Sequence, residues 1–157
     1  MHNHIYGPVE LIATGVALTG VVPTNEILTG ELVALAGGVA VPADAFTWNT
    51  DIATTQTNFA AALLGVSADN SLAASDNALS VEISVHTDGT FDADLLAAAT
   101  VEIGNYLAPA KNPSSNSLVN ELVVVATKAR ATHVVQQRET VATTKVKARL
   151  INTPHKR

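Results

Sequence analysis

The 157-residue chain contains no cysteine, which excludes a disulfide scaffold, a thiolate metal site and a thiol nucleophile. Aromatic residues make up only 4% of the chain, and charged residues 15%. Charged residues form about a quarter of an average soluble domain. Low charge combined with 47% apolar residues excludes a disordered acidic or basic chain. A chain of this length can bury roughly two thirds of its surface, which suffices for one core.

Basic residues are absent from the first 110 positions, which carry twelve acidic residues. The last 47 positions carry nine basic and two acidic residues. Such a division of charge favours an interaction surface, formed either between copies of the chain or against a partner. The alternative is that the two segments pair with each other inside one domain. Both hypotheses stay open on the sequence alone.

The N-terminal region shows no targeting or membrane pattern. No basic residue precedes the first apolar stretch, residues 9–22, which contains Glu10 and is followed by Pro23. This stretch is too short and too interrupted for a bilayer span, and it lacks the basic region of a secretory signal. We therefore expect no membrane partner.

Alternation of apolar and polar residues is the main structural signal, and it predicts a mainly β fold. Residues 78–87 alternate and are followed by Asp88-Gly89, a pair typical of turns. Residues 31–41 predict two short strands around Gly37-Gly38. Residues 122–126 are apolar throughout, which predicts a strand covered on both faces. Weaker strand signals lie in residues 100–107 and 132–138.

Residues 141–151 alternate most clearly near the C-terminus. The predicted apolar face holds Val146, Ala148 and Leu150, and the opposite face holds Lys145, Lys147 and Arg149. We interpret this basic face as a candidate partner-binding surface. One alternative is a solvated edge strand protected by lysine. Contact with nucleic acid phosphates is disfavoured, because the chain is acidic and no aromatic residue lies among the bases.

Only two short helices are predicted. One covers residues 56–64 and stops at Gly65, and the other covers residues 92–99, whose early acids suit a helix N-terminus. The whole pattern predicts a compact β-barrel or β-sandwich. Residues 1–30 would form an extended N-terminal arm or edge strands, and residues 31–157 a single β-rich domain.

Two patterns resemble metal-ligand spacing. His2 and His4 lie beside the N-terminus, where neutral imidazoles can bind zinc, copper or nickel. Asp88, Asp92 and Asp94 surround Gly89 with oxygen ligands that calcium favours, but the spacing is not that of an EF-hand loop. The alternative for these acids is a turn followed by a helix that begins with acidic residues. We expect no metal and no cofactor.

No catalytic set is recognisable. The chain lacks the Gly-x-Ser-x-Gly and phosphate-loop motifs, and His133 lies in an expected strand without a neighbouring acid or serine. A histidine in that setting is typical of a structural residue. Aromatic residues that could form a sugar subsite are few, chiefly Trp48 and Tyr106. We therefore expect no enzymatic activity.

Four segments resemble strands of the capsid decoration proteins, also called cement or head-stabilising proteins, of tailed bacteriophages. They are Gly-Val-Ala-Val-Pro-Ala (38–43), Ala-Leu-Leu-Gly-Val-Ser (62–67), Val-Val-Val-Ala-Thr-Lys-Ala (123–129) and Thr-Thr-Lys-Val-Lys-Ala-Arg-Leu-Ile (143–151). The resemblance extends over residues 30–151. The chain departs from the commonest pattern by an acidic insert at 86–99 and a longer N-terminal arm.

This resemblance implies a non-enzymatic virion protein that assembles in the host cytoplasm and sits on the capsid surface. It would bind the major capsid protein at junctions between subunits, without a cofactor, as a homo-oligomer and commonly a trimer. An alternative is a carbohydrate- or host-surface-binding module of a virion, which would expose Trp48 or Tyr106 in a shallow site. An enzyme is a third interpretation and would need two carboxylates converging in a pocket.

Overall fold

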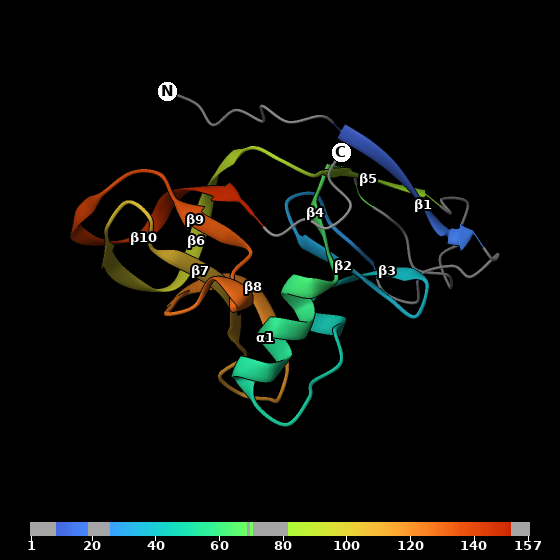
Figure 1. Cartoon of the computed structure of the whole chain (residues 1–157), viewed down its shortest axis with the longest axis horizontal. Coiled ribbons are helices and arrows are strands. Elements are labelled where there is room, and N and C mark those ends of the chain that lie inside the picture. The colour runs from blue at the N-terminus through green and yellow to red at the C-terminus, as the bar shows by residue number, and fades with distance from the viewer. Residues whose placement is uncertain (1–8, 19–25, 69, 71–81, 152–157) are drawn as a thin grey trace.

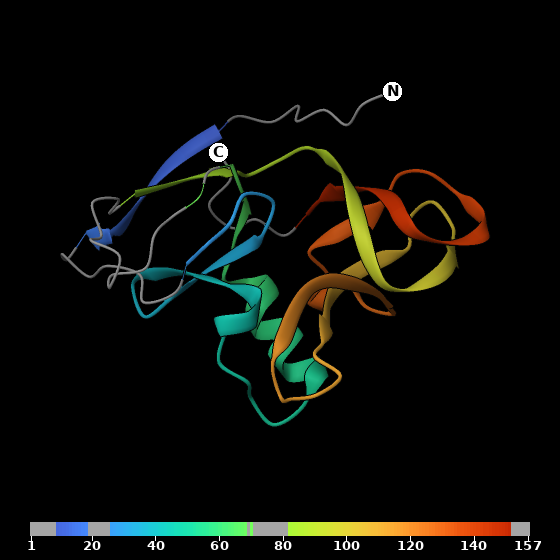
Figure 2. The same ribbon diagram turned by 180° about the vertical axis from the view of Figure 1, so that it is seen from behind.

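The computed structural model describes residues 9–18, 26–68, 70 and 82–151. Within them the chain forms a closed barrel and an open five-stranded sheet, together with one α-helix and short 3-10 turns (Figure 1). The prediction of a mainly β fold with a barrel is therefore confirmed. Figure 2 shows the chain passing from the sheet into the barrel along one long segment.

The open sheet has the order β1-β5-β4-β2-β3, and its neighbouring strands are antiparallel. Its strands are β1 (Val9–Leu18), β2 (Leu32–Ala36), β3 (Val39–Pro42), β4 (Leu63–Ser67) and β5 (Glu82–His86). β1, within the N-terminal segment 1–30, is an edge strand that pairs with β5 of the same chain. Residues 78–81 of the predicted strand 78–87 lie outside the described residues.

The predicted hairpin in residues 31–41 is confirmed as β2 and β3. Gly37 and Gly38 connect the two strands, and their φ angles are 58° and 83°. A two-residue turn that follows the strand twist needs positive φ at both positions, which glycine adopts without a steric penalty.

The barrel has the order β10-β6-β8-β7-β9. Its strands are β6 (Thr90–Val101), β7 (Tyr106–Lys111), β8 (Leu118–Val125), β9 (His133–Val135) and β10 (Glu139–Leu150). β6 and β8 run parallel where Leu95 pairs with Leu122, and the other pairs are antiparallel. Asp88-Gly89 joins β5 to β6 and so connects the two sheets instead of closing a hairpin.

The predicted helix at residues 92–99 is wrong, because this segment lies in β6. Phe91, Ala93 and Leu95 are buried, whereas Asp92 and Asp94 are exposed. This alternation has the period of a strand, and the acids face basic residues on β10, not a helix N-terminus. Acidic residues are favoured near a helix N-terminus, but here the pairing of β6 with the distant strand β10 decides the structure.

The other helix exists with different bounds, as α1 (Ile52–Ala61). It begins earlier than predicted because Asp51 caps it: an Asp51 Oδ1 accepts a 2.7 Å hydrogen bond from the Thr54 amide. It ends before Leu63, where β4 begins, so Gly65 lies inside a strand and does not stop the helix. α1 packs against β7 and the 3-10 turn Lys128–Arg130.

The prediction that residues 122–126 are covered on both faces is also wrong. Val123 and Val124 of β8 are each 41% exposed. Residues 132–138 contain the predicted strand only as the short β9. Residues 100–107 are divided between the end of β6 and the start of β7, with a turn between them.

One apolar core lies between the sheet and the barrel. Leu32, Phe59 and Leu63 contribute to it from the sheet and α1. Its barrel side includes Phe91, Leu107, Leu118, Leu122, Val146, Ala148 and Leu150. The apolar face predicted for residues 141–151 is thus confirmed. Since the residues of both sheets form one cluster, the two sheets are packed as a single unit.

A further polar contact ties α1 to the barrel. Arg130 donates hydrogen bonds of 2.8 and 2.6 Å to Gln56 Oε1, and Gln56 Nε2 donates a 2.7 Å bond to the Pro109 carbonyl. The Gln56 side chain is fully buried, so these bonds satisfy a group that would be costly to bury unpaired.

Gly65→Ala tests a close approach of two backbones in the sheet. A Cβ atom at Gly65 would collide with the His86 carbonyl oxygen and lie 2.9 Å from its carbon, whereas nothing lies within 4 Å of a Cβ at Gly37. We expect Gly65→Ala to lower the free energy of unfolding by at least about 3 kcal/mol. Gly37→Ala, the matched control, should cost about 1–2 kcal/mol from its positive φ. Equal losses in denaturant titrations would contradict the close approach.

Candidate functional site

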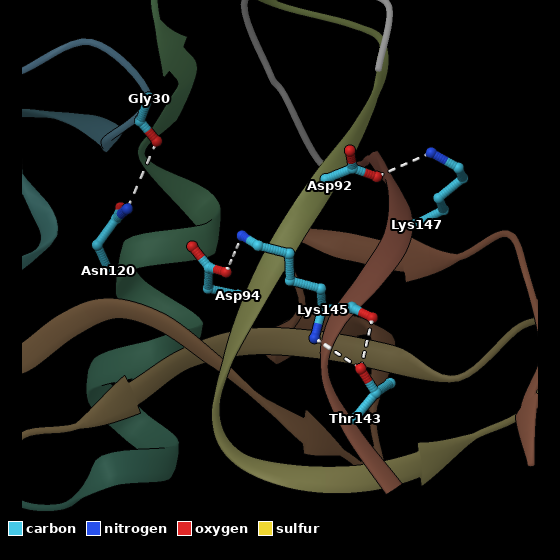
Figure 3. A network of polar contacts seen from close by, with 7 residues as sticks. All are labelled: Gly30, Asp92, Asp94, Asn120, Thr143, Lys145 and Lys147. Carbon is cyan, nitrogen blue, oxygen red and sulfur yellow. Dashed lines mark hydrogen bonds and ion pairs between the residues drawn. The ribbon is translucent and has the colours of Figure 1, made fainter. Parts of the chain in front are cut away.

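A cavity of about 300 Å³ opens at the seam between the open sheet and the barrel. Figure 3 shows three of the polar side chains that line it, Asp92, Asp94 and Asn120. Its lining comprises Gly30, Leu32 and Val66 from the sheet side, and Phe91, Asp92, Ala93, Asp94, Asn120, Glu121, Leu122 and His133 from the barrel. The cavity therefore combines apolar walls with three carboxylates, one amide and one imidazole.

Asn120 of β8 fixes the seam on one side of this cavity. Its Oδ1 accepts a 2.7 Å hydrogen bond from the Leu32 amide. Its Nδ2 donates a 3.4 Å bond to the Gly30 carbonyl, which Figure 3 shows. The side-chain amide thus bonds the start of β2 as a neighbouring strand would. Removal of this side chain would leave the Leu32 amide without its partner, so Asn120 positions the sheet against the barrel.

His133 of β9 forms part of the cavity wall and is only 3% exposed. Its Nδ1 lies 2.9 Å from Thr132 Oγ1, and its ring meets the edge of Phe91 at a centroid distance of 6.3 Å. Burial lowers the pKa of His133 from 6.5 to about 4, because the charged imidazolium would lose its hydration. The ring is therefore neutral at neutral pH.

The predicted basic face forms an ion-pair ladder with β6. We use this name for Lys145, Lys147 and Arg149 of the C-terminal strand with Asp94, Asp92 and Asp88. The β10–β6 register sets Lys145 opposite Asp94 and Lys147 opposite Asp92. The three nitrogen–oxygen distances are 2.5 Å for Lys145–Asp94, 2.8 Å for Lys147–Asp92 and 3.2 Å for Arg149–Asp88. Figure 3 shows the two lysine pairs.

Each cation of the ladder already has a carboxylate partner. The hydrogen bond and charge of Asp94 raise the pKa of Lys145 above its ordinary value. Solvent-exposed pairs contribute little to stability, so their main effect is to neutralise both strands. β10 pairs with β6 on one side and β9 on the other, so the edge-strand interpretation of this face is wrong. A partner-binding role for the three basic residues stays a prediction.

A fourth ion pair, at 2.9 Å, joins Arg138 to Glu102 near the other end of the same strands. All four pairs connect the acidic first 110 residues with the basic C-terminal segment. Pairing within one domain therefore accounts for part of the charge asymmetry.

The remaining candidates lie elsewhere. Asp88, Asp92 and Asp94 are occupied in the ladder, and the described residues contain no group of three or more His, Cys, Asp or Glu side chains arranged to hold a metal. His2 and His4 lie outside the described residues.

The two aromatic residues considered for a sugar site do not line the cavity. Trp48 is half-buried, with Lys111 Nζ 5.8 Å above its ring, and Tyr106 is half-buried in β7. None of the described helices is long and apolar enough to cross a membrane.

Sequence reasoning missed the cavity and its residues Asn120, Glu121 and Gly30. Asn120 and Glu121 interrupt an otherwise apolar strand, which is the one local signal that marked them. That signal gives no hint of the contact with residues 30–32, since the contact depends on how the two sheets pack. No protein-family model, curated protein or solved structure matches this chain.

Acid titration tests the burial of His133. A folded-state pKa below the unfolded value means that protonation favours unfolding, so stability is full above pH 6.5 and falls as the pH drops toward about 4. The loss by pH 4 should be roughly 3 kcal/mol. The free energy of unfolding of His133→Gln should not show this loss. Subtracting the free energy of the variant from that of the wild type at each pH removes the contribution of the carboxylates that both proteins share. Parallel stability–pH curves for the two proteins would contradict the assignment.

Proposed function

We propose that this chain is a structural virion protein that binds the outside of a tailed-phage capsid. It stabilises junctions between major capsid protein subunits, acts as a homo-oligomer of three copies, and uses neither a cofactor nor a catalytic group. Three of the segments that resemble decoration proteins fall on β3, β4 and β10, and the segment 123–129 covers the end of β8 and runs into the 3-10 turn after it. Their placement on sheet and barrel strands supports the proposal, because a resemblance between strands requires strands in this chain.

The observation that carries the proposal is an uncharged, solvent-exposed ribbon on the barrel. We call residues 96–100 of β6 and 140–144 of β10 the uncharged ribbon, since neither segment contains a charged residue. It continues the strands of the ion-pair ladder beyond Asp94 and Lys145. Leu96, Ala97 and Ala98 are exposed in succession, as are residues 140–142, and Val141 is 76% exposed.

Exposure of consecutive residues means that both faces of this ribbon meet solvent in the single chain. Two further large, exposed aliphatic residues lie near the uncharged ribbon. Val123 of β8 is one step beyond the Leu95–Leu122 pair and so is next to Leu96, and Ile103, 68% exposed, follows β6 in the turn. An apolar surface of this kind on a soluble barrel is typical of a protein–protein interface. A capsid surface, or a neighbouring copy bound there, would cover it.

Val141→Lys tests this contact. The side chain is largely exposed, so the fold should persist while an added charge opposes burial of the ribbon. We expect about tenfold weaker co-sedimentation with heads assembled from the major capsid protein encoded alongside this chain. Asn58→Lys, on the exposed side of α1, adds the same charge elsewhere and should bind as the wild type does.

Two results would count against the proposal. Failure of the wild type to bind the heads would contradict the capsid role itself. Equal binding by the Val141 and Asn58 variants would contradict the ribbon as the contact. Light scattering of the same proteins across a dilution series reports whether Val141→Lys also separates the copies.

The predicted role of Lys145, Lys147 and Arg149 needs a different variant, because replacing all three with Glu sets like charges against Asp94, Asp92 and Asp88. That triple variant should lower the thermal unfolding midpoint. A six-residue exchange, which also replaces the three aspartates with Lys, restores opposite charges across the strands. If the capsid binds Lys145, Lys147 and Arg149 through their positive charges, the exchanged protein should fold normally and should no longer bind heads. Binding of the exchanged protein to heads would contradict the predicted partner-binding role of these three residues.

The carbohydrate-binding alternative predicts a readout that a capsid protein lacks. The lysine above Trp48 and the half-burial of Tyr106 give it little support, since stacking on a sugar needs an open ring face. Saturable binding on a glycan array would favour it, with no requirement for heads.

A further inference from the structure

The charged side chains that line the seam cavity are all acidic. No lysine or arginine lines it, whereas Asp92, Asp94 and Glu121 do. The ladder lysines bond only Oδ1 of Asp92 and Oδ1 of Asp94, which leaves the second oxygen of each carboxylate able to accept. A carboxylate offers about four lone-pair positions, and one ammonium contact does not fill them.

His133 supplies a second and independent acceptor. Thr132 Oγ1 lies 3.5 Å from the Leu107 carbonyl, to which its hydroxyl can donate, and 2.9 Å from His133 Nδ1. In the tautomer that fits a Thr132 hydroxyl donating to the Leu107 carbonyl, His133 Nδ1–H donates to Thr132 Oγ1, and Nε2 keeps its lone pair. The His133 side chain lines the cavity and is only 3% exposed. No described residue donates a hydrogen bond to its Nε2.

The walls suit a ligand with an aliphatic part. Leu32, Val66 and Phe91 come from three different strands and provide apolar surface beside the acceptors. A bare metal ion fits poorly, because the described residues hold no three ligating side chains close enough to share one ion, whereas a guanidinium spreads its donors over a larger group. The complementary group is a larger cation that only donates hydrogen bonds and carries an apolar stem. Arginine meets this description, with five N–H donors, no acceptor and three methylene groups.

We propose that the seam cavity binds the guanidinium group of an arginine side chain presented by a partner protein. The cation lies among Asp94, Glu121 and His133, and the stem lies against the apolar wall. The low pKa of His133 supports this arrangement, because a neutral ring keeps its acceptor at neutral pH. The inference does not depend on whether the partner is a capsid subunit.

The test uses the isolated full-length chain and a defined probe, N-acetyl-arginine methylamide. Titration is followed by ¹H–¹⁵N spectra of the backbone and of the His133 ring nitrogens. We expect saturable shifts at cavity residues and at His133 Nε2, with a dissociation constant of roughly 1–10 mM, as befits one side chain. The citrulline analogue has nearly the same shape without the charge and should bind at least about fivefold more weakly.

Glu121→Gln provides the variant, and Glu139→Gln the matched control. Both remove one carboxylate from a barrel strand, Glu121 being exposed and Glu139 half-buried, but only Glu121 lines the cavity. The first should weaken binding of the probe about threefold or more, and the second should leave it unchanged.

Three results would overturn the proposal. The first is the absence of saturable shifts up to about 50 mM probe, a concentration range that covers the weakest affinities of a single side chain. The second is equal binding of the arginine and citrulline analogues. The third is a shift of the cavity resonances by neutral monosaccharides together with no response to the arginine probe. Because heads are not used, failure here is distinct from failure of the capsid proposal.

Discussion

Packing of the open sheet and the barrel against one apolar core is the interaction on which the other features depend. Phe59 and Leu63 enter this core from one side, and Phe91, Leu107 and Leu118 from the other. Neither small sheet encloses that much apolar surface alone, so each supplies a face that the other covers. The connection from β5 to β6 is short and carries the chain directly across the boundary.

The seam between the sheets lies beside this core, since Leu32, Val66, Phe91 and Leu122 belong both to the core and to the lining of the cavity. Asn120 closes one side of the gap by bonding backbone groups at Gly30 and Leu32. Gly65 shows how near the strands approach inside the sheet, where a Cβ would strike His86. The cavity is therefore a product of the fold, and its carboxylates come from strand positions that also serve the barrel surface.

Strand alternation predicted the C-terminal strand and the β2–β3 hairpin, because the burial of Val146 and the turn at Gly37-Gly38 depend on local pattern. The helix prediction for residues 92–99 was wrong because the acidic residues there pair with cations about fifty residues away, and local helix preferences contain no information about that pairing. For β8, apolar composition indicated burial on both faces, yet Val123 remains exposed. The cavity residues needed knowledge of sheet packing, and no local pattern contains it.

The ion pairs also explain how an acidic chain could present selective contacts. Four acids and four bases neutralise each other along β6, β10 and the adjoining turns, and the exposed ribbon beyond the ladder carries no charge. Outside these pairs the chain retains ten acids and five bases, so its longer-range field is negative. On the two proposals above, that field would attract a basic partner at a distance, and the uncharged ribbon and the seam cavity would provide the short-range fit. Added salt should therefore weaken both the long-range attraction and the charge-dependent binding of arginine in the cavity, and should leave contact with the uncharged ribbon largely unchanged.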